Sequence, residues 1–518
     1  MSTFAPTAEQ QEALRLFATG KSLVVEAGAG TGKTSTLKLL AESAPNRRGQ
    51  YLAFNRAIVE ESKAKFPRSV RCNTAHSAAF RVMVQKPTVN MDRLRSPRMK
   101  SWDIAARLGI TQGIRLETQD GERKNLSATY LAGLTMKAVT GFCQSADLEP
   151  SAFHVPYIKG IDVPPGAFTN NREVARTLVP YMKRAWADLM TRDGSLPFTH
   201  DHYLKAWQLD DPRIAVDFIL FDEAQDANPV LVDIVRRQEG HAQLVWVGDS
   251  QQQIYTFTGA VNAMQTVGAE QTTYLTQSFR FGPAIAEAAN HVLSQIEGAQ
   301  LRLLGLPTIE STVGTVTEPD AILTRTNAEA VRNVLQAIKE GKRPHLVGGA
   351  GDIVAFAKAA QALMDGGTTE HPDLACFDSW NEVVEYVEQD EQGGDLQLLV
   401  KLIDEFTVQV ILDALDNMAP EHTADVIVST AHKSKGREWN TVQLGGDFPD
   451  QPEGEELRLL YVSITRAKMR LDHDAVPFLT NGVRITRETI DLTPSPAFVE
   501  AIMDAVDHDA PDHDFAAC

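Results

Sequence analysis

The stretch Ala27-Gly-Ala-Gly-Thr-Gly-Lys-Thr34 decides the fold of this chain. It follows an apolar run, Ser22 to Ala27, and it opens a helix-like stretch, Ser35 to Leu40. A strand, a glycine-rich loop and a helix in this order predict a phosphate-binding loop, because glycines let backbone N–H groups converge on phosphate oxygens without interference from Cβ. Ala27 stands where the strict pattern begins with glycine, and a chance glycine-rich turn is the alternative on this motif alone.

A short acidic motif, Asp222-Glu-Ala-Gln-Asp226, follows another apolar run in the same way. Cleavage of a nucleoside triphosphate needs Mg²⁺, an oriented water and positive charge near the phosphates. We expect Lys33 to reach the outer phosphates, and Thr34 and Asp222 to hold Mg²⁺. Glu223 is placed to orient and deprotonate the attacking water. The loop and the acids together predict a nucleoside triphosphatase that uses Mg²⁺.

The composition is that of an ordinary globular protein, with 43% hydrophobic and 23% charged residues among 518. This length predicts three or four domains. No apolar run is long enough to span a membrane, and the start lacks a basic segment followed by an apolar core. Four cysteines without a CxxC pair argue against a zinc or iron–sulfur site and favour a reducing compartment. We expect a cytoplasmic protein, nucleoid-associated if the host is a bacterium or a phage.

The net charge of −18 conceals a basic region. Between Ser43 and Ile110 there are fourteen Lys and Arg against four Asp and Glu. Such a region on an acidic protein suits a polyanion bound along one face, and the alternative is a solvated face that happens to be basic. The end, Asp491 to Cys518, has seven acids and no Lys or Arg, which predicts a mobile acidic tail.

Alternating short apolar runs and helical stretches predict two α/β regions with parallel sheets, each carrying a mainly helical insertion. The predicted domains are residues 1–85 and 205–271 for the first α/β region, 86–204 for its insertion, 272–350 and 423–490 for the second α/β region, 351–422 for its short insertion, and 491–518 for the tail.

Several further segments follow one another in a fixed order. They are TAEQQEAL around Gln10, NTAHS (73–77), GDSQQQIYTFTGA (248–260), QSFR (277–280), TRTNA (324–328), STAHKSKGREW (429–439) and YVSITRAK (461–468). With the phosphate loop and DEAQD, this series resembles the UvrD/Rep-like branch of superfamily 1 DNA helicases over about residues 6–468, apart from most of the insertions. Within that branch, LPFTHDHYLKAWQL (196–209) and DEAQDANP look most like the F-box DNA helicase group, and no F-box segment precedes the helicase motifs here.

The resemblance implies two RecA-like P-loop domains that bind ATP. It makes Gln10 the reader of the adenine edge, Phe279 the aromatic that stacks on adenine, and Glu438 the acceptor for the ribose hydroxyls. It makes Gln252 the sensor of the γ-phosphate, and Arg280 and Arg466 the cations that stabilise charge on the transferred phosphoryl group. The loop would contribute Ala29, Gly30, Thr31 and Gly32 beside Lys33 and Thr34. Ser35 stands where the family often has an arginine that supports the base, which leaves base selectivity open.

The resemblance also implies a groove for single-stranded DNA, with aromatic platforms and groups that track the backbone. Phe257 matches the aromatic that stacks on a base, Tyr255 is its neighbour, and Thr258 replaces an arginine of many relatives. Other expected groove residues are Phe54, Asn55, Thr74, His76, Arg325, Asn327 and His432. Phe54 is shifted by one position from the common pattern, and His76 and His432 could equally be buried, hydrogen-bonded histidines.

The sequence therefore predicts an ATP-dependent translocase on single-stranded DNA and a DNA helicase, with a 3′ to 5′ direction implied by the family. Its expected partners are single-stranded DNA and single-strand/duplex junctions, with proteins able to bind through the insertions or the acidic tail. The alternatives are a DNA-stimulated ATPase that remodels protein–DNA complexes without productive unwinding, and a subunit whose ATP site is regulatory. RNA as the track is a further variant.

Overall fold

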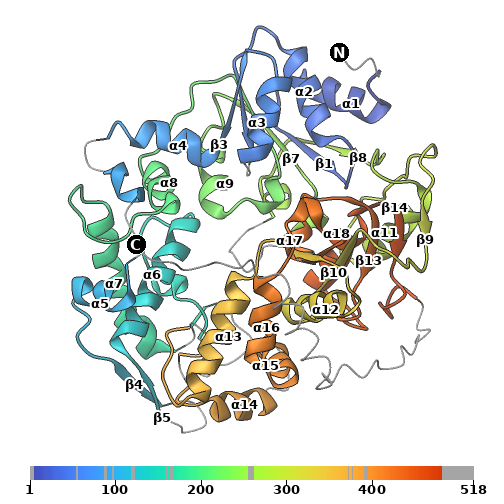
Figure 1. The fold of residues 1–518 in the computed structure, drawn as a ribbon. Coiled ribbons are helices and arrows are strands. Elements are labelled where there is room, and N and C mark those ends of the chain that lie inside the picture. Colours follow the sequence, from blue (N-terminus) through green and yellow to red (C-terminus); the bar gives the residue numbers. More distant parts are fainter. Residues whose placement is uncertain are drawn as a thin grey trace, which may run out of the picture. The chain divides into compact units, whose positions relative to one another are not determined.

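The computed structural model of the chain contains two units that are each built on a parallel sheet (Figure 1). Unit 1 comprises residues 1–279 and 300–303, and unit 2 comprises residues 280–299 and 304–518. The structure describes residues 5–53, 56–86, 90–95, 99–117, 123–158, 161–162, 168–169, 171–254, 262–371, 373–375, 377–389 and 395–480.

Six parallel strands in the order β3-β2-β6-β7-β1-β8 form the sheet of unit 1. The strands are β1 (Leu23–Ala27), β2 (Gly49–Ala53), β3 (Val70–Thr74), β6 (Phe218–Phe221), β7 (Gln243–Gly248) and β8 (Gln271–Leu275). Helices α1 (Ala8–Phe17), α2 (Lys33–Ser43), α3 (Arg56–Lys65), α4 (Ala75–Met83), α9 (Pro229–Arg236) and α10 (Ala263–Thr266) flank it, with 3₁₀ turns η3 (Ala224–Asp226) and η4 (Ser250–Gln252).

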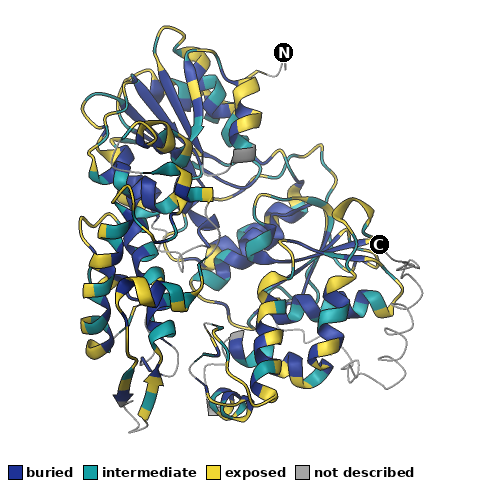
Figure 2. Cartoon of the chain, turned by 60° about the vertical axis from the view of Figure 1, so that its left-hand side comes forward, coloured by how far each residue is buried: buried dark blue, intermediate teal, exposed yellow. Residues whose placement is uncertain are grey.

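Strand alternation decides which helices cover each face of this sheet. On β1, Leu23 and Val25 share a core with α1, α2 and α3, whereas Val24 belongs to a core with α4, α9 and the insertion helices. Both faces are covered, which is why the strands of this parallel sheet are rich in apolar residues. Figure 2 shows the strands of the sheets as predominantly buried.

The insertion in unit 1 consists mainly of helices, as the sequence predicts, and also contains a small antiparallel hairpin. Its elements are η1 (Met91–Arg95), α5 (Ser101–Leu108), β4 (Ile114–Glu117), β5 (Arg123–Leu126), α6 (Ala128–Gln144), η2 (Ala152–His154), α7 (Arg172–Leu189) and α8 (His200–Leu209). Their apolar side chains continue the core on the Val24 face of the sheet, so the described residues of the insertion pack as part of unit 1.

Unit 2 contains a second sheet of six parallel strands in the order β11-β12-β10-β13-β14-β9. The strands are β9 (Thr312–Val313), β10 (Ala321–Thr324), β11 (Pro344–Leu346), β12 (Val426–Thr430), β13 (Trp439–Leu444) and β14 (Ala467–Asp472). The flanking helices are α11 (Pro283–Gln295), α12 (Asn327–Lys339), α17 (Ala431–Ser434) and α18 (Glu455–Ile464), with η6 (Glu421–Thr423). The predicted fold class, α/β with two parallel sheets, is confirmed.

Four helices follow β11 and share one core with α12. They are α13 (Gly351–Met364), α14 (Trp380–Gln389), α15 (Asp395–Phe406) and α16 (Val408–Asp416). Three of the predicted domain boundaries fall inside secondary-structure elements: the one at 204/205 lies within α8, the one at 271/272 lies within β8, which pairs with β1, and the one at 422/423 lies within η6. Across the described part of the chain, no helix is long and apolar enough to cross a membrane.

Candidate nucleotide site and its neighbours

The phosphate loop leaves β1 at Ala27 and ends where α2 begins at Lys33. Gly30 and Gly32 have φ angles of 73° and 79°, a left-handed conformation that glycine adopts at little cost. The Lys33 Nζ donates to the Ala27 carbonyl at 3.1 Å and lies 3.5 Å from the Gly28 carbonyl oxygen. The ammonium therefore lies along the loop, among groups that would face a bound phosphate chain.

The two residues expected to recognise adenine lie together beside this loop. A Cβ atom placed on Gly32 would come within 3.8 Å of both the Gln10 Nε2 and the Phe279 ring. The Phe279 N–H donates to the Gly30 carbonyl at 2.8 Å, and its side chain is 45% exposed. Gln10 donates to the Thr36 hydroxyl at 3.2 Å. The tertiary structure thus brings an amide and an open aromatic face to the start of α2.

Asp222 and Glu223 lie at the end of β6, where the chain turns sharply. The Asp222 carboxylate accepts from the Tyr51 hydroxyl at 2.7 Å and from the Glu223 N–H at 3.0 Å. Burial and the neighbouring Glu223 carboxylate raise the pKa of Asp222, and the Lys33 charge opposes this increase. Glu223 has a φ of 54°, a left-handed conformation that costs a non-glycine residue about 1–3 kcal/mol and is typical of functional sites.

A chain of hydrogen bonds connects Glu223 with the residue expected to sense the γ-phosphate. The Gln225 amide donates to the Glu223 carboxylate at 2.6 Å and accepts from the Asp249 N–H at 3.1 Å. The Asp249 carboxylate in turn accepts from the Gln252 side chain at 2.7 Å. Amide side chains suit such a chain because one end donates while the other accepts. Hydrogen bonds therefore connect the Asp222–Asp226 motif with the segment Asp249 to Gln252 inside unit 1.

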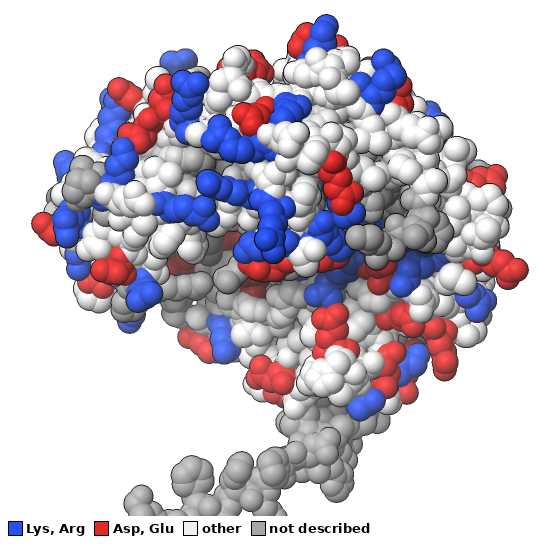
Figure 3. Space-filling view, turned by 90° about the horizontal axis from the view of Figure 1, so that it is seen from above, with Lys and Arg blue, Asp and Glu red and all other residues white. Residues whose placement is uncertain are grey.

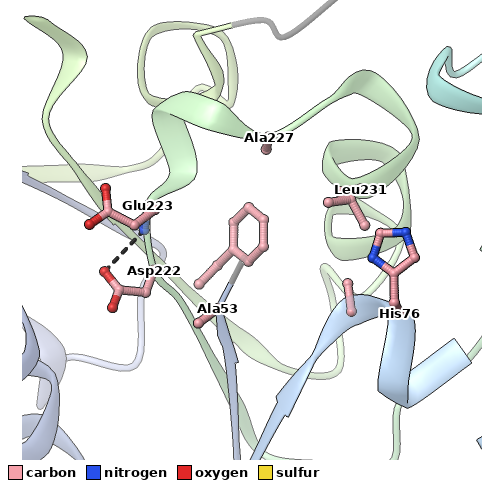
Figure 4. A pocket seen from close by; sticks show the side chains of 8 residues that line it. Ala53, His76, Asp222, Glu223, Ala227 and Leu231 are labelled. Carbon is pink, nitrogen blue, oxygen red and sulfur yellow. Dashed lines mark hydrogen bonds between the residues drawn. The ribbon is translucent and has the colours of Figure 1, made fainter. Parts of the chain in front are cut away.

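A small cavity lies beside the acids (Figure 4). In Figure 4, Asp222 and Glu223 lie on one side of it, and His76 and Leu231 lie on the opposite side. The lining residues are Ala53, Ala75, His76, Phe221, Asp222, Glu223, Ala227 and Leu231. The structure thus connects the expected water-activating acid with a residue expected in the DNA groove.

Oxygen donors suited to Mg²⁺ are present at the predicted metal site. Mg²⁺ is usually held by one or two carboxylates together with substrate phosphates and waters. The buried Asp222 carboxylate and the Thr34 hydroxyl have the chemistry that this arrangement needs. No group of three or more His, Cys, Asp or Glu that could hold a metal ion occurs among the residues described, so a metal cage built only from protein side chains is not found there.

In unit 2, three residues expected at the nucleotide lie close to the turn at Thr465. The Arg280 guanidinium donates to the Thr465 carbonyl at 2.8 Å and pairs with the Glu438 carboxylate at 2.7 Å. Arg466 is buried, and its Nε donates to the Val462 carbonyl at 2.9 Å. Glu438, expected to face a ribose, is thus an ion-pair partner of an arginine in this structure.

Two expected DNA-groove residues belong to α4 and the strand before it. Thr74 caps α4, because its hydroxyl accepts from the Ser77 N–H at 3.1 Å. His76 is partly exposed, and its Nε2 lies 3.5 Å from a carboxylate oxygen of Asp201 on α8. The histidine is therefore neither fully buried nor isolated, and it joins the helicase motif to the insertion.

The expected groove residues of unit 2 lie after β10 and β12. Arg325 pairs with the Glu456 carboxylate at 2.8 and 2.9 Å, and Asn327 is the first residue of α12. The His432 Nε2 lies 3.9 Å from a carboxylate oxygen of Glu455. Four further predicted groove residues and the acidic tail lie outside the described residues; these are Phe54, Asn55, Tyr255, Phe257 and residues 491–518.

Basic side chains gather on one face of the molecule. Figure 3 looks down on the side where α2 and α3 lie in Figure 1 and shows a band of Lys and Arg across it. Two lysines of α2 and α3 have nearby carboxylates, since Lys38 pairs with Glu42 and Lys63 pairs with Glu60, both at 2.8 Å. Exposed pairs of this kind contribute little stability.

Sequence reasoning missed the polar residues that connect the motifs. Glu26, Gln225 and Asp249 are among them, and their role depends on which strands are neighbours in the sheet. One signal was available, because Glu26 is an acid inside the otherwise apolar segment Leu-Val-Val-Glu-Ala. A charged residue in a central parallel strand requires a buried partner, and its partner follows β7 more than two hundred residues later.

Two protein-family models match the chain. An AAA domain matches residues 10–258, and a UvrD-like helicase C-terminal domain matches residues 425–471. The first match covers the phosphate loop and the Asp222–Asp226 motif, and the second covers the region that contains Glu438 and Arg466.

Curated relatives match over most of this chain. F-box DNA helicase protein 1 of Schizosaccharomyces pombe is 30% identical over 87% of this chain and 55% of that protein. F-box DNA helicase 1 of Gallus gallus is 29% identical over 89% of this chain and 48% of that protein, and DNA helicase IV of Escherichia coli is 24% identical over 87% and 65%. The chain spans about half the length of the two F-box proteins.

Proposed function

Since the chain belongs to the UvrD-like helicase family, we propose that it is an ATP-dependent motor that moves 3′ to 5′ along single-stranded DNA and separates duplex DNA. The observation that supports this most directly is the cluster around the phosphate loop. Lys33 is near enough to influence the pKa of Asp222, and Glu223 follows directly at the same strand end. The 3′ to 5′ direction is taken over from the family resemblance.

In this proposal, the residues of unit 1 bind ATP and prepare the water. The Lys33 ammonium exchanges its loop carbonyls for phosphate oxygens, while Gln10 and Phe279 hold the base. Bound Mg²⁺, held by Asp222 and Thr34, would neutralise phosphate charge. Glu223 accepts the proton of the attacking water, a role that its fixed backbone conformation and its bond from Gln225 favour.

Unit 2 supplies positive charge for the same reaction. A guanidinium is planar and permanently charged, so it stabilises charge on a phosphoryl group without changing its own protonation state. We assign this role to Arg280 and Arg466. Arg280 pairs with Glu438, and in this proposal both side chains exchange part of this ion pair for contacts with ATP.

We propose that single-stranded DNA binds the expected groove residues, which lie near strand ends in each unit. His76 connects this track to hydrolysis, because it lines the same cavity as Asp222 and Glu223. ATP and DNA are then linked ligands, and each must change the affinity for the other by the same factor. Single-stranded DNA and single-strand/duplex junctions are the proposed substrates, with the basic face of Figure 3 as the region that attracts them.

The experiment that tests this proposal is steady-state ATP hydrolysis without nucleic acid and with single-stranded DNA, duplex DNA or single-stranded RNA. We expect single-stranded DNA to stimulate ATP hydrolysis more than the other polymers do. Lys33→Ala should abolish ATP hydrolysis. Unwinding of duplexes with a 3′ or a 5′ single-stranded tail then tests direction. Stimulated hydrolysis without unwinding would favour a remodelling ATPase, and no stimulation by any polymer would contradict the motor proposal.

A further inference from the structure

The strand that leads into the phosphate loop carries one partly buried acid. Glu26 is the fourth residue of β1, between Val25 and Ala27, and it pairs in register with Gly248 of β7. This register places its side chain next to the residues that leave β7, which are Asp249 and the turn η4. An apolar residue would suit this position in a central parallel strand, so the acid calls for a functional explanation.

The Glu26 carboxylate binds the first residue of η4 with both oxygens. Its Oε1 accepts from the Ser250 N–H at 2.7 Å, and its Oε2 accepts from the Ser250 hydroxyl at 2.6 Å. Asp249 fixes the rest of the turn, because it accepts from the Gln251 N–H at 3.1 Å and from the Gln252 side chain at 2.7 Å. Two carboxylates therefore hold η4, one from β1 and one from its own N-terminus.

We propose that Glu26 is a positioning residue for nucleotide hydrolysis, which fixes η4, and with it Gln252, relative to the strand that carries the phosphate loop. This inference rests on the proposed function. A γ-phosphate sensor must be held closely in place to act, since small displacements at a reacting centre reduce rates strongly. Because the phosphate loop follows directly after this strand, Glu26 connects the strand end that carries the loop with the turn that carries the sensor.

The charged groups around Glu26 support a functional role for its carboxylate. Glu26 faces a second carboxylate, Asp249, and the Lys33 ammonium is the cation that offsets their repulsion. Burial and Asp249 raise the pKa of Glu26 to about 7, while the bonds from Ser250 and the Lys33 charge lower it. Two neighbouring acids, one buried and one partly buried, are costly to a fold, and such costs are typical of active sites, where geometry matters more than stability.

The test compares hydrolysis by wild type, Glu26→Gln, Glu26→Leu and Ser250→Ala. We expect both Glu26 variants to lower kcat by about 10- to 100-fold, as is typical when a residue that orients an active-site group is lost, with a smaller change in KM for ATP. Ser250→Ala removes only one of the two donors and should have a smaller effect. If Glu26 acts through Ser250, the double variant Glu26→Gln/Ser250→Ala should be no slower than Glu26→Gln alone.

A pH profile separates positioning from a general loss of folded protein. In wild type, kcat should decrease as pH falls through about 7, because a protonated carboxyl group loses one of its two acceptor positions. Glu26→Gln should lack this decrease. Asp162→Asn is the matched control, since Asp162 is a buried carboxylate that accepts from the Ile158 N–H at 2.7 Å and the Thr169 hydroxyl at 2.6 Å in the insertion. It should keep the wild-type profile.

Amide hydrogen exchange tests the contact between Glu26 and Ser250 without relying on ATP hydrolysis. The amides of residues 250–252 should exchange about tenfold faster or more in Glu26→Gln than in wild type, since an anchored turn opens less often. If wild type hydrolyses ATP and Glu26→Gln remains within about twofold of its kcat with the same pH profile, this inference is wrong and the proposed function stands. If wild type hydrolyses no ATP under any condition, the proposed function is wrong as well.

Discussion

The two sheets have the same architecture, but different charged side chains lie next to their strands. In unit 1 the residues that follow β6 and β7 are acids, Asp222 and Asp249, and β1 itself contains Glu26. In unit 2 arginines lie next to two strands, with Arg325 after β10 and Arg466 before β14. Two similar folds can therefore carry different chemistry, because the residues at strand ends vary more freely than the buried residues within the strands.

The two groups of charges are also stabilised differently. In unit 1, removal from water and neighbouring carboxylates raise the pKa values of Asp222 and Glu26, while the hydrogen bonds that these acids accept from Tyr51 and Ser250 oppose the increase. The arginines of unit 2 donate to carbonyl oxygens and pair with carboxylates, as Arg280 does with Thr465 and Glu438. An acid whose pKa rises can exchange protons near neutral pH, whereas an arginine stays charged. This difference is consistent with the roles proposed above for the acids of unit 1 and the arginines of unit 2.

The largest effect is expected from removing positive charge in unit 2. Arg280→Gln should lower kcat for ATP hydrolysis by about 10³- to 10⁵-fold, the range observed for arginines that stabilise phosphoryl transfer. The measurement is DNA-stimulated steady-state hydrolysis. Arg343→Gln is the control, because Arg343 also forms an ion pair, with Asp425 at 2.9 Å, just before β11. Similar activities for the two variants would contradict the assignment of Arg280.

The next effect concerns the acid expected to activate water in unit 1. Glu223→Gln should lower kcat by about 10²- to 10⁴-fold while ATP still binds, because the amide cannot accept the proton. Single-turnover hydrolysis and equilibrium ATP binding together test this. Asp217→Asn changes an acid just before the same strand, where Asp217 accepts from the Arg48 N–H at 2.7 Å. Near-normal turnover by Glu223→Gln would mean that another group activates the water.

A smaller effect is expected on stability, through Glu26. Its pKa of about 7 in the folded protein exceeds the ordinary value of 4.5, so the folded state binds this proton more tightly. The stability of wild type should therefore fall as pH rises from about 4.5 to about 7. Glu26→Gln lacks this dependence, and relative to wild type it should gain up to about 3 kcal/mol between pH 5 and pH 8. Urea denaturation across this pH range measures it, and a constant difference between the two proteins would contradict the raised pKa.

The smallest effect concerns DNA. Phe257→Ala should weaken binding of single-stranded DNA by about 1–3 kcal/mol, the contribution of one stacked base. Titration of labelled single-stranded DNA at fixed salt measures this, and Phe257→Trp should retain most of the affinity. Binding by Phe257→Ala equal to wild type would place the stacking platform elsewhere.

The sequence by itself determined the fold class and the residue types of the nucleotide site. Glycines in the loop before α2, the acids after β6 and the ordered motifs depend on local spacing, which is readable along the chain. The alternation of apolar runs and helical stretches likewise indicated two parallel sheets, because buried parallel strands have a distinct composition.

Only the tertiary structure decided which of these residues meet. Strand order placed Glu26 opposite Gly248 and therefore next to Ser250, and it added to the unit 1 sheet the strand β8, which crosses the boundary predicted at 271/272. The insertion shares the core of unit 1, so no composition change marks where it ends, and the boundary predicted at 204/205 falls inside α8. Contacts between residues far apart in sequence depend on the order of strands in the sheet, which local patterns do not specify.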